Sequence, residues 1–105
     1  MTLIRVLLAD DHPALRMGMR VLLDASPKIT VVSEVDDGHD AVQQIKLLLP
    51  DVAILDCQLP GLDGVQVAEE IAKKKLQVRV LGLSAYDDDR YLSGMKRAGA
   101  SGYFL

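Results

Sequence analysis

The fold is decided by residues 52–64, which read Val52-Ala53-Ile54-Leu55-Asp56-Cys57-Gln58-Leu59-Pro60-Gly61-Leu62-Asp63-Gly64. The first four residues are apolar and predict a short β-strand that is buried on both faces. The apolar run ends at Asp56, and the proline and glycines beyond it indicate a turn. Open α/β sheets bind their ligands just beyond the carboxyl ends of their strands. Asp56 is therefore a candidate functional residue, although aspartate is also common in turns that have no function.

On either side of this stretch, strand-like segments alternate with segments of helical periodicity. The expected strands are Ile4 to Ala9, Ile29 to Val35, the central strand, Val78 to Leu83 and one that begins at Tyr103. The expected helices begin near Pro13, after the turn Asp36-Asp37-Gly38, after Gly64 and at Asp87-Asp88-Asp89. The apolar face of the first is expected at Leu15, Met19, Leu22 and Leu23, and that of the third at Val65, Ala68, Ile71 and Ala72. This alternation predicts an α/β fold with a doubly wound, five-stranded parallel sheet.

The composition is that of one soluble domain. Half of the 105 residues are hydrophobic and 26% are charged, which is ordinary for an α/β protein. The net charge of −3 argues against binding of nucleic acid or an anionic membrane by this segment. The single cysteine excludes an internal disulfide and a multi-cysteine metal site. The chain begins without the features of a signal peptide and has no apolar run near the ~20 residues of a membrane span, so we expect a cytoplasmic protein.

Polar residues follow three of the expected strands. Asp10 and Asp11 come after the first, Asp56 ends the third and Ser84 follows the fourth. Because parallel strands share one direction, these residues should meet at one edge of the sheet. Two carboxylates roughly 4–5 Å apart repel by about 3–4 kcal/mol at an effective dielectric constant near 20, and a hard divalent cation such as Mg²⁺ removes that repulsion. This edge therefore predicts a Mg²⁺ site at which a carboxylate accepts a phosphoryl group.

Three motifs resemble the receiver domain of two-component response regulators, of the NarL/FixJ type. They are Val6-Leu7-Leu8-Ala9-Asp10-Asp11-His12-Pro13, the loop from Leu55 to Gly64, and Ala98-Gly99-Ala100-Ser101-Gly102-Tyr103. The resemblance covers the whole chain in register. It implies a flavodoxin-like sheet with the strand order 2-1-3-4-5. It also implies a phosphoacceptor signalling domain and not an enzyme in the turnover sense, since such a domain catalyses only its own phosphorylation and dephosphorylation.

By this resemblance, Asp56 is the phosphoacceptor and attacks a phosphohistidine of a sensor histidine kinase. The resemblance implies that Mg²⁺ is held by Asp10, Asp11 and Asp56, and that the backbone carbonyl of Gln58 completes the protein ligands. No other cofactor is expected.

The resemblance also assigns a switch. Ser84 is the switch hydroxyl and Tyr103 the switch aromatic. When Asp56 is phosphorylated, Ser84 moves toward the phosphoryl group and Tyr103 turns into the vacated space, so the surface from the fourth helix to the fifth strand changes shape. Such surfaces mediate dimerisation or contact with an output domain. We therefore expect a homodimer on activation and, in the parent protein, a helix-turn-helix DNA-binding output that regulates transcription.

Receivers also carry a lysine three residues after the switch aromatic, and a fifth helix. Counted from Tyr103, that lysine falls beyond Leu105. We therefore expect residues 1–105 to be a receiver domain truncated just after the start of its fifth strand, without its C-terminal helix or output domain. The alternative is an interaction module with a receiver fold that works without phosphorylation. A Mg²⁺-dependent phosphatase is disfavoured, because it needs a second aspartate where Gln58 stands.

The histidines, the cysteine and the lysines near these motifs are interpreted as structural or solvent-exposed residues. His12 lies beside the acidic edge and could contact a phosphodonor, but it is interpreted, like His39, as a residue that begins a helix. A metal site that uses these histidines is disfavoured, because their spacing matches no ligand motif. Cys57 is expected to point away from Asp56 as a packed thiol, because neighbouring strand residues face opposite sides. The lysines at positions 73–75 and 96 are expected to face solvent.

Overall fold

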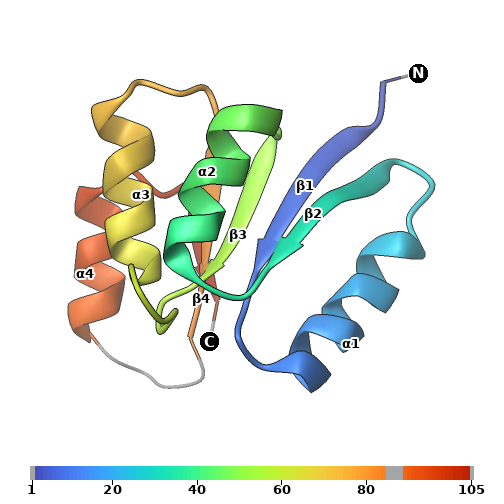
Figure 1. Cartoon of the computed structure of the whole chain (residues 1–105), viewed down its shortest axis with the longest axis horizontal. Coiled ribbons are helices and arrows are strands. Elements are labelled where there is room, and N and C mark those ends of the chain that lie inside the picture. The colour runs from blue at the N-terminus through green and yellow to red at the C-terminus, as the bar shows by residue number, and fades with distance from the viewer. Residues whose placement is uncertain (1, 85–88, 105) are drawn as a thin grey trace.

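The computed structural model describes residues 2–84 and 89–104 (Figure 1). The strands are β1 (Ile4–Ala9), β2 (Ile29–Val35), β3 (Val52–Asp56), β4 (Arg79–Leu83) and β5 (Gly102–Phe104), and the helices are α1 (Pro13–Asp24), α2 (Gly38–Leu48), α3 (Gly64–Lys73) and α4 (Asp89–Arg97). Asp87, Asp88 and Leu105, on which sequence predictions also fell, lie outside the described residues. No helix in the described ranges is both long and apolar enough to span a membrane.

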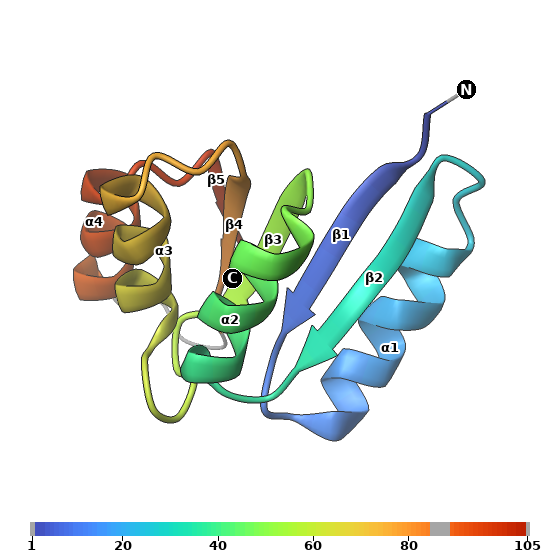
Figure 2. The ribbon, with the colours of Figure 1, turned by 45° about the horizontal axis from the view of Figure 1, so that its top comes forward.

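The strands form one parallel sheet in the order β2-β1-β3-β4-β5, which confirms the predicted doubly wound fold and its strand order. β3 occupies the middle, paired with β1 on one side and β4 on the other. Helices α2, α3 and α4 gather on one face of the sheet, and α1 lies on the other face beside β2 (Figure 2). Because β3 is covered on both faces, its sequence is continuously apolar and does not alternate.

Side chains of β1 and β3 alternate between two hydrophobic clusters, one on each face of the sheet. The larger cluster lies under α2, α3 and α4, and its fully buried members include Leu7, Ala9, Ala41, Ile45, Ala53, Leu55 and Val67. The smaller cluster, on the α1 face, consists of Val6, Leu8 and Ile54, with the partly buried Met19 and Leu23 packed against it. The core is therefore concentrated on the face that carries three helices.

Two predicted helix faces are partly wrong. In α1, Leu15 and Leu22 are 49% and 75% exposed, because this helix packs mainly along the edge strand β2 and reaches few core side chains. In α3, Ala72 is exposed, whereas Val67, which was not predicted, is fully buried. The buried side of α3 follows positions 64, 67, 68 and 71, a helical spacing that leaves Ala72 at its margin.

The loop between β3 and α3 is fixed at both of its ends. The N–H of Gly38, the first residue of α2, donates to the carbonyl of Pro60 at 3.0 Å. Gly38 also approaches the carbonyl oxygen of Leu62 so closely that a Cβ there would lie 1.8 Å from it. Asp63 begins α3 with a capping box, in which its side chain and that of Gln66 each accept the other's backbone N–H. The chain beyond β3 is thus held in one place.

Candidate functional site

Three polar residues stand where neighbouring strands end on one edge of the sheet. Asp10 directly follows β1, Asp56 is the last residue of β3, and Ser84 follows β4. All three are buried, and they line a pocket of about 390 Å³. The other lining residues are His12, Leu15, Met19, Gln58 and Leu83. The structure therefore brings the predicted Asp10, Asp56, Gln58 and Ser84 to one pocket.

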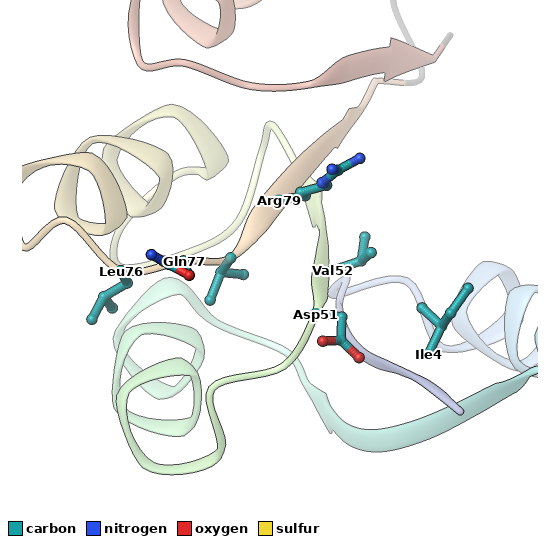
Figure 3. A pocket seen from close by; sticks show the side chains of 7 residues that line it. Ile4, Asp51, Val52, Leu76, Gln77 and Arg79 are labelled. Atoms are coloured by element: carbon teal, nitrogen blue, oxygen red, sulfur yellow. The ribbon is translucent and has the colours of Figure 1, made fainter. Parts of the chain in front are cut away.

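A larger pocket, of about 520 Å³, opens at the opposite edge of the sheet (Figure 3). Figure 3 shows Ile4, Asp51, Val52 and Arg79 around it, where β1, β3 and β4 begin. The carboxylate of Asp51 is engaged by the fold, because its Oδ2 accepts the N–H of Arg5 at 2.8 Å. Since α/β sheets bind their ligands at the carboxyl ends of the strands, the pocket at Asp56 is the candidate site.

The acidic group at this pocket is suited to a divalent cation. Ligand atoms of Asp10, Asp11, His12 and Asp56 all lie within 4.8 Å of one another. Asp10 is completely buried, and its Oδ1 accepts the backbone N–H of His12 at 2.6 Å. Its Oδ2 is buried without a hydrogen-bond partner, which is costly for a carboxylate. A hard cation bound to that oxygen would remove the cost, so the residues fit Mg²⁺.

Asp56 is held in an environment that opposes its negative charge. Its Oδ1 accepts the N–H of Gln58 at 2.9 Å, and its side chain is only 8% exposed. Burial raises the pKa of Asp56 above its usual value. The hydrogen bond from Gln58 and the charge of His12 lower this pKa, whereas the charges of Asp10 and Asp11 raise it further. A cation beside Asp56 would therefore stabilise its ionised, nucleophilic form.

His12 begins α1, as predicted, and its side chain also belongs to this acidic group. It is the N-cap residue of α1, but its side chain makes no capping hydrogen bond. Its Nδ1 lies 3.0 Å from Oδ1 of Asp10, 3.1 Å from Oδ1 of Asp11 and 3.4 Å from Oδ2 of Asp56. The hydrogen bond with Asp10 and the charge of Asp11 raise the pKa of His12. In the sequence, His12 directly follows Asp10 and Asp11. The turn there brings its N–H back to the side chain of Asp10.

The response regulator receiver domain family matches residues 6–105. The chain belongs to this family. It is a receiver domain of a two-component response regulator, related to DNA-binding regulators of the NarL and LuxR families. Receiver domains are phosphoacceptor signalling domains and not conventional enzymes, as expected from the sequence.

Among similar proteins, the "Probable transcriptional regulatory protein NarL" of Mycobacterium tuberculosis is 43% identical over 102 residues, which are 97% of this chain and 47% of that protein. The nitrate/nitrite response regulator protein NarL of Escherichia coli is 34% identical over 100 residues, which are 95% of this chain and 46% of that protein. The solved receiver domain of NarL from M. tuberculosis superposes with a TM-score of 0.96 at 42% identity, over 100% of this chain and 85% of that one. The receiver domain thus spans about half the length of the curated relatives it matches.

Other sequence predictions for this receiver domain concern Tyr103, Cys57 and the lysines at positions 73–75 and 96. The backbone of Tyr103 pairs with Gly82 in the β4–β5 ladder, but its side chain lies outside the described residues. Cys57 is fully buried, as predicted, and its N–H donates to the carbonyl of Leu83 at 2.8 Å. The lysines at 73–75 and 96 are exposed, also as predicted.

Replacing Asp56 with asparagine should stabilise this receiver domain in the absence of divalent cations. The substitution removes a buried charge that lies near two other carboxylates, and it keeps an oxygen that can accept the N–H of Gln58. We expect a gain of about 1 kcal/mol in the free energy of unfolding, which raises Tm by about 4–8 °C in a domain of this size. Thermal unfolding followed by circular dichroism in the presence of a chelator measures this.

The pH dependence of this gain checks its cause. A carboxyl group whose pKa is raised by folding contributes stability below its unfolded pKa, and that contribution is lost as the pH rises through its folded pKa. The advantage of Asp56→Asn should therefore be largest at neutral pH and should shrink as the solution is acidified. An equal gain at all pH values would assign the effect to packing and not to charge.

Proposed function

We propose that Asp56 accepts a phosphoryl group from the phosphohistidine of a sensor histidine kinase. The observation that carries this proposal is a carboxylate at the end of the central strand, in a pocket that also holds a buried carboxylate oxygen without a partner. Membership of the receiver family supports it, since these domains are phosphoacceptors.

In the proposed transfer, a carboxylate oxygen of Asp56 attacks the phosphorus atom. The bond between phosphorus and the donor imidazole nitrogen breaks, and the bonding electron pair leaves with the imidazole. The N–H of Gln58 holds Oδ1 of Asp56 and so fixes the orientation of the nucleophile. Asp56 is only 6% exposed, and this burial limits the access of water to the acyl phosphate that forms.

We propose that Mg²⁺ is the cation of this site, held by Asp10, Asp11, Asp56 and the backbone carbonyl of Gln58. When bound, the ion supplies positive charge beside the transferring phosphoryl group. The carboxylates of Asp10 and Asp11 place that charge beside Asp56, and burial of Asp10 keeps its position fixed.

We propose that Ser84 and Tyr103 carry the signal away from Asp56. Ser84 lines the same pocket as Asp56, so its hydroxyl can bond to a phosphoryl oxygen after a local movement. Tyr103 belongs to β5, which pairs with the strand that ends beside Ser84. A shift of these two residues would reshape the surface formed by α4 and β5.

That surface would control homodimerisation and an output domain in the parent protein. Several relatives, among them NarL of M. tuberculosis, are named as transcriptional regulatory proteins, and one similar solved structure, from Staphylococcus aureus, is named a DNA-binding response regulator of the LuxR family. They are about twice as long as the region they share with this chain. We therefore propose that residues 1–105 are the receiver part of a regulator whose DNA-binding output is helix-turn-helix.

The test is intact-protein mass after incubation with Mg²⁺ and acetyl phosphate. We expect a gain of one phosphate, about 80 Da, in the parent protein and none in Asp56→Asn. Asp36→Asn is the matched control, because Asp36 is an exposed aspartate in a separate acidic group and should leave the gain intact. A folded parent protein without an adduct would favour the alternative, an interaction module that works without phosphorylation.

A further inference from the structure

We propose that His12 is a ligand, through Nδ1, of the divalent cation held by Asp10, Asp11 and Asp56, and that it gives this site a preference for cations that accept nitrogen. The proposal rests on the cation site of the proposed function and extends it to the choice of metal. The evidence is the position of the imidazole, the spacing of the four ligand atoms and the unpartnered oxygen of Asp10.

The spacing of these atoms is that of a coordination shell. A six-coordinate ion with ligands at about 2.1 Å places neighbouring ligand atoms about 3 Å apart. In the structure, Nδ1 of His12 lies 3.0, 3.1 and 3.4 Å from oxygens of Asp10, Asp11 and Asp56, respectively. One nitrogen and three carboxylate oxygens, from two neighbouring strand ends, therefore already stand close to the separations that one ion requires.

The backbone holds the imidazole toward the acids. The N–H of His12 donates to Oδ1 of Asp10 at 2.6 Å, which draws the residue against the acidic group. Residues at the N-cap usually use their side chains to accept a helix N–H, but His12 makes no such bond. Its side chain is instead directed to the carboxylates and is 57% exposed, so it forms the solvent side of the group.

The carboxylate of Asp10 carries an independent sign of a bound ion. Oδ2 of Asp10 is buried and has no hydrogen-bond partner, although Oδ1 of the same carboxylate contacts both the N–H and the ring of His12. Hydrogen bonding to His12 thus leaves half of this carboxylate unsatisfied. An ion between Asp10, Asp11 and Asp56, with His12 completing its shell, would satisfy Oδ2 as well.

A nitrogen ligand changes which metal the site prefers. Carboxylate and carbonyl oxygens suit Mg²⁺ and Mn²⁺, whereas imidazole suits later first-row metals such as Ni²⁺. We expect His12→Ala to lower the affinity for Ni²⁺ by about tenfold and that for Mg²⁺ by much less. Isothermal titration calorimetry with each metal alone gives the two affinities, at mildly alkaline pH so that the imidazole is deprotonated.

Pulsed electron paramagnetic resonance of the Mn²⁺-loaded protein tests ligation directly. We expect coupling to a directly bound ¹⁴N nucleus in the parent protein and in His39→Ala, where an exposed histidine outside the acidic group is removed. We expect that coupling to be absent in His12→Ala. His12→Asn, which retains a good N-cap residue, should also lose the coupling and guards against loss of α1 in the alanine variant.

The outcomes separate this inference from the proposed function. Bound Mn²⁺ without ¹⁴N coupling, in a protein that still gains phosphate on Asp56, would overturn ligation by His12 and leave the phosphoacceptor role intact. The same holds if His12→Ala binds Ni²⁺ and Mg²⁺ with unchanged or higher affinity, since the imidazole would then only compete with the ion. Absence of any divalent cation binding by the folded parent protein would overturn both the ligand role and the proposed Mg²⁺ site.

Discussion

Asp10→Ala is expected to lower the affinity of this receiver domain for Mg²⁺ by at least about 100-fold. Asp10 is completely buried beside Asp56, and one of its oxygens has no partner within the protein. Without that oxygen, the ion would have to be held by the exposed Asp11, Asp56 and a backbone carbonyl. Because a cation that binds only the folded state stabilises it, the parent protein should show a Tm that rises with Mg²⁺ concentration, and Asp10→Ala should not.

The same measurement on Asp36→Asn gives the control. Asp36 belongs to the second acidic group, with Asp37 and Asp40, so this variant reports cation binding away from the site. Its Tm should rise with Mg²⁺ as that of the parent protein does. A Mg²⁺-dependent Tm that survives in Asp10→Ala and disappears in Asp36→Asn would move the cation site to the second group.

Gly38→Ala is expected to lower the free energy of unfolding by at least about 3 kcal/mol, and Tm by about 12 °C or more. A Cβ at this position would lie 1.8 Å from the carbonyl oxygen of Leu62 and 2.5 Å from its carbonyl carbon. These are backbone atoms in a loop that is fixed at both ends, so the clash cannot be relieved by turning a side chain. Urea or thermal unfolding measures the loss.

Gly18→Ala is the matched control for the general effect of alanine in a helix. Gly18 lies inside α1, and a Cβ there would have no neighbour within 4 Å. The substitution should stabilise the protein by about 0.5–1 kcal/mol, because alanine loses less conformational entropy in a helix than glycine does. Similar stability changes in the two variants would show that the loop between β3 and α3 moves to accommodate a side chain at position 38.

Much of this fold could be predicted from the sequence because its signals are local. The bounds predicted for β1 and β2 are those observed, since each strand is an apolar or β-branched run that ends at polar turn residues. The buried face of α1 could not be predicted in the same way. Leu15 and Leu22 have the spacing of a packed face, but their burial depends on which strand α1 lies against.

In the candidate site, too, some features could be predicted from the sequence and others depend on the tertiary structure. Asp10, Asp56 and Ser84 could be brought together from the sequence, because parallel strands place their carboxyl ends at one edge. His12 could be placed beside this edge, but its contacts with the three carboxylates could not be predicted, since they depend on the turn between Asp10 and α1 and on the direction of one side chain.

The central position of β3 determines when the acidic group is completed during synthesis of the chain. β1 pairs with both β2 and β3, and β1, α1, β2 and α2 are all translated before Asp56. Asp56 comes beside Asp10 only when β3 pairs with β1. A nascent chain halted before β3 should bind neither Mg²⁺ nor phosphate. The acidic group of Asp10, Asp11, His12 and Asp56 is thus completed only once β3 has paired with β1.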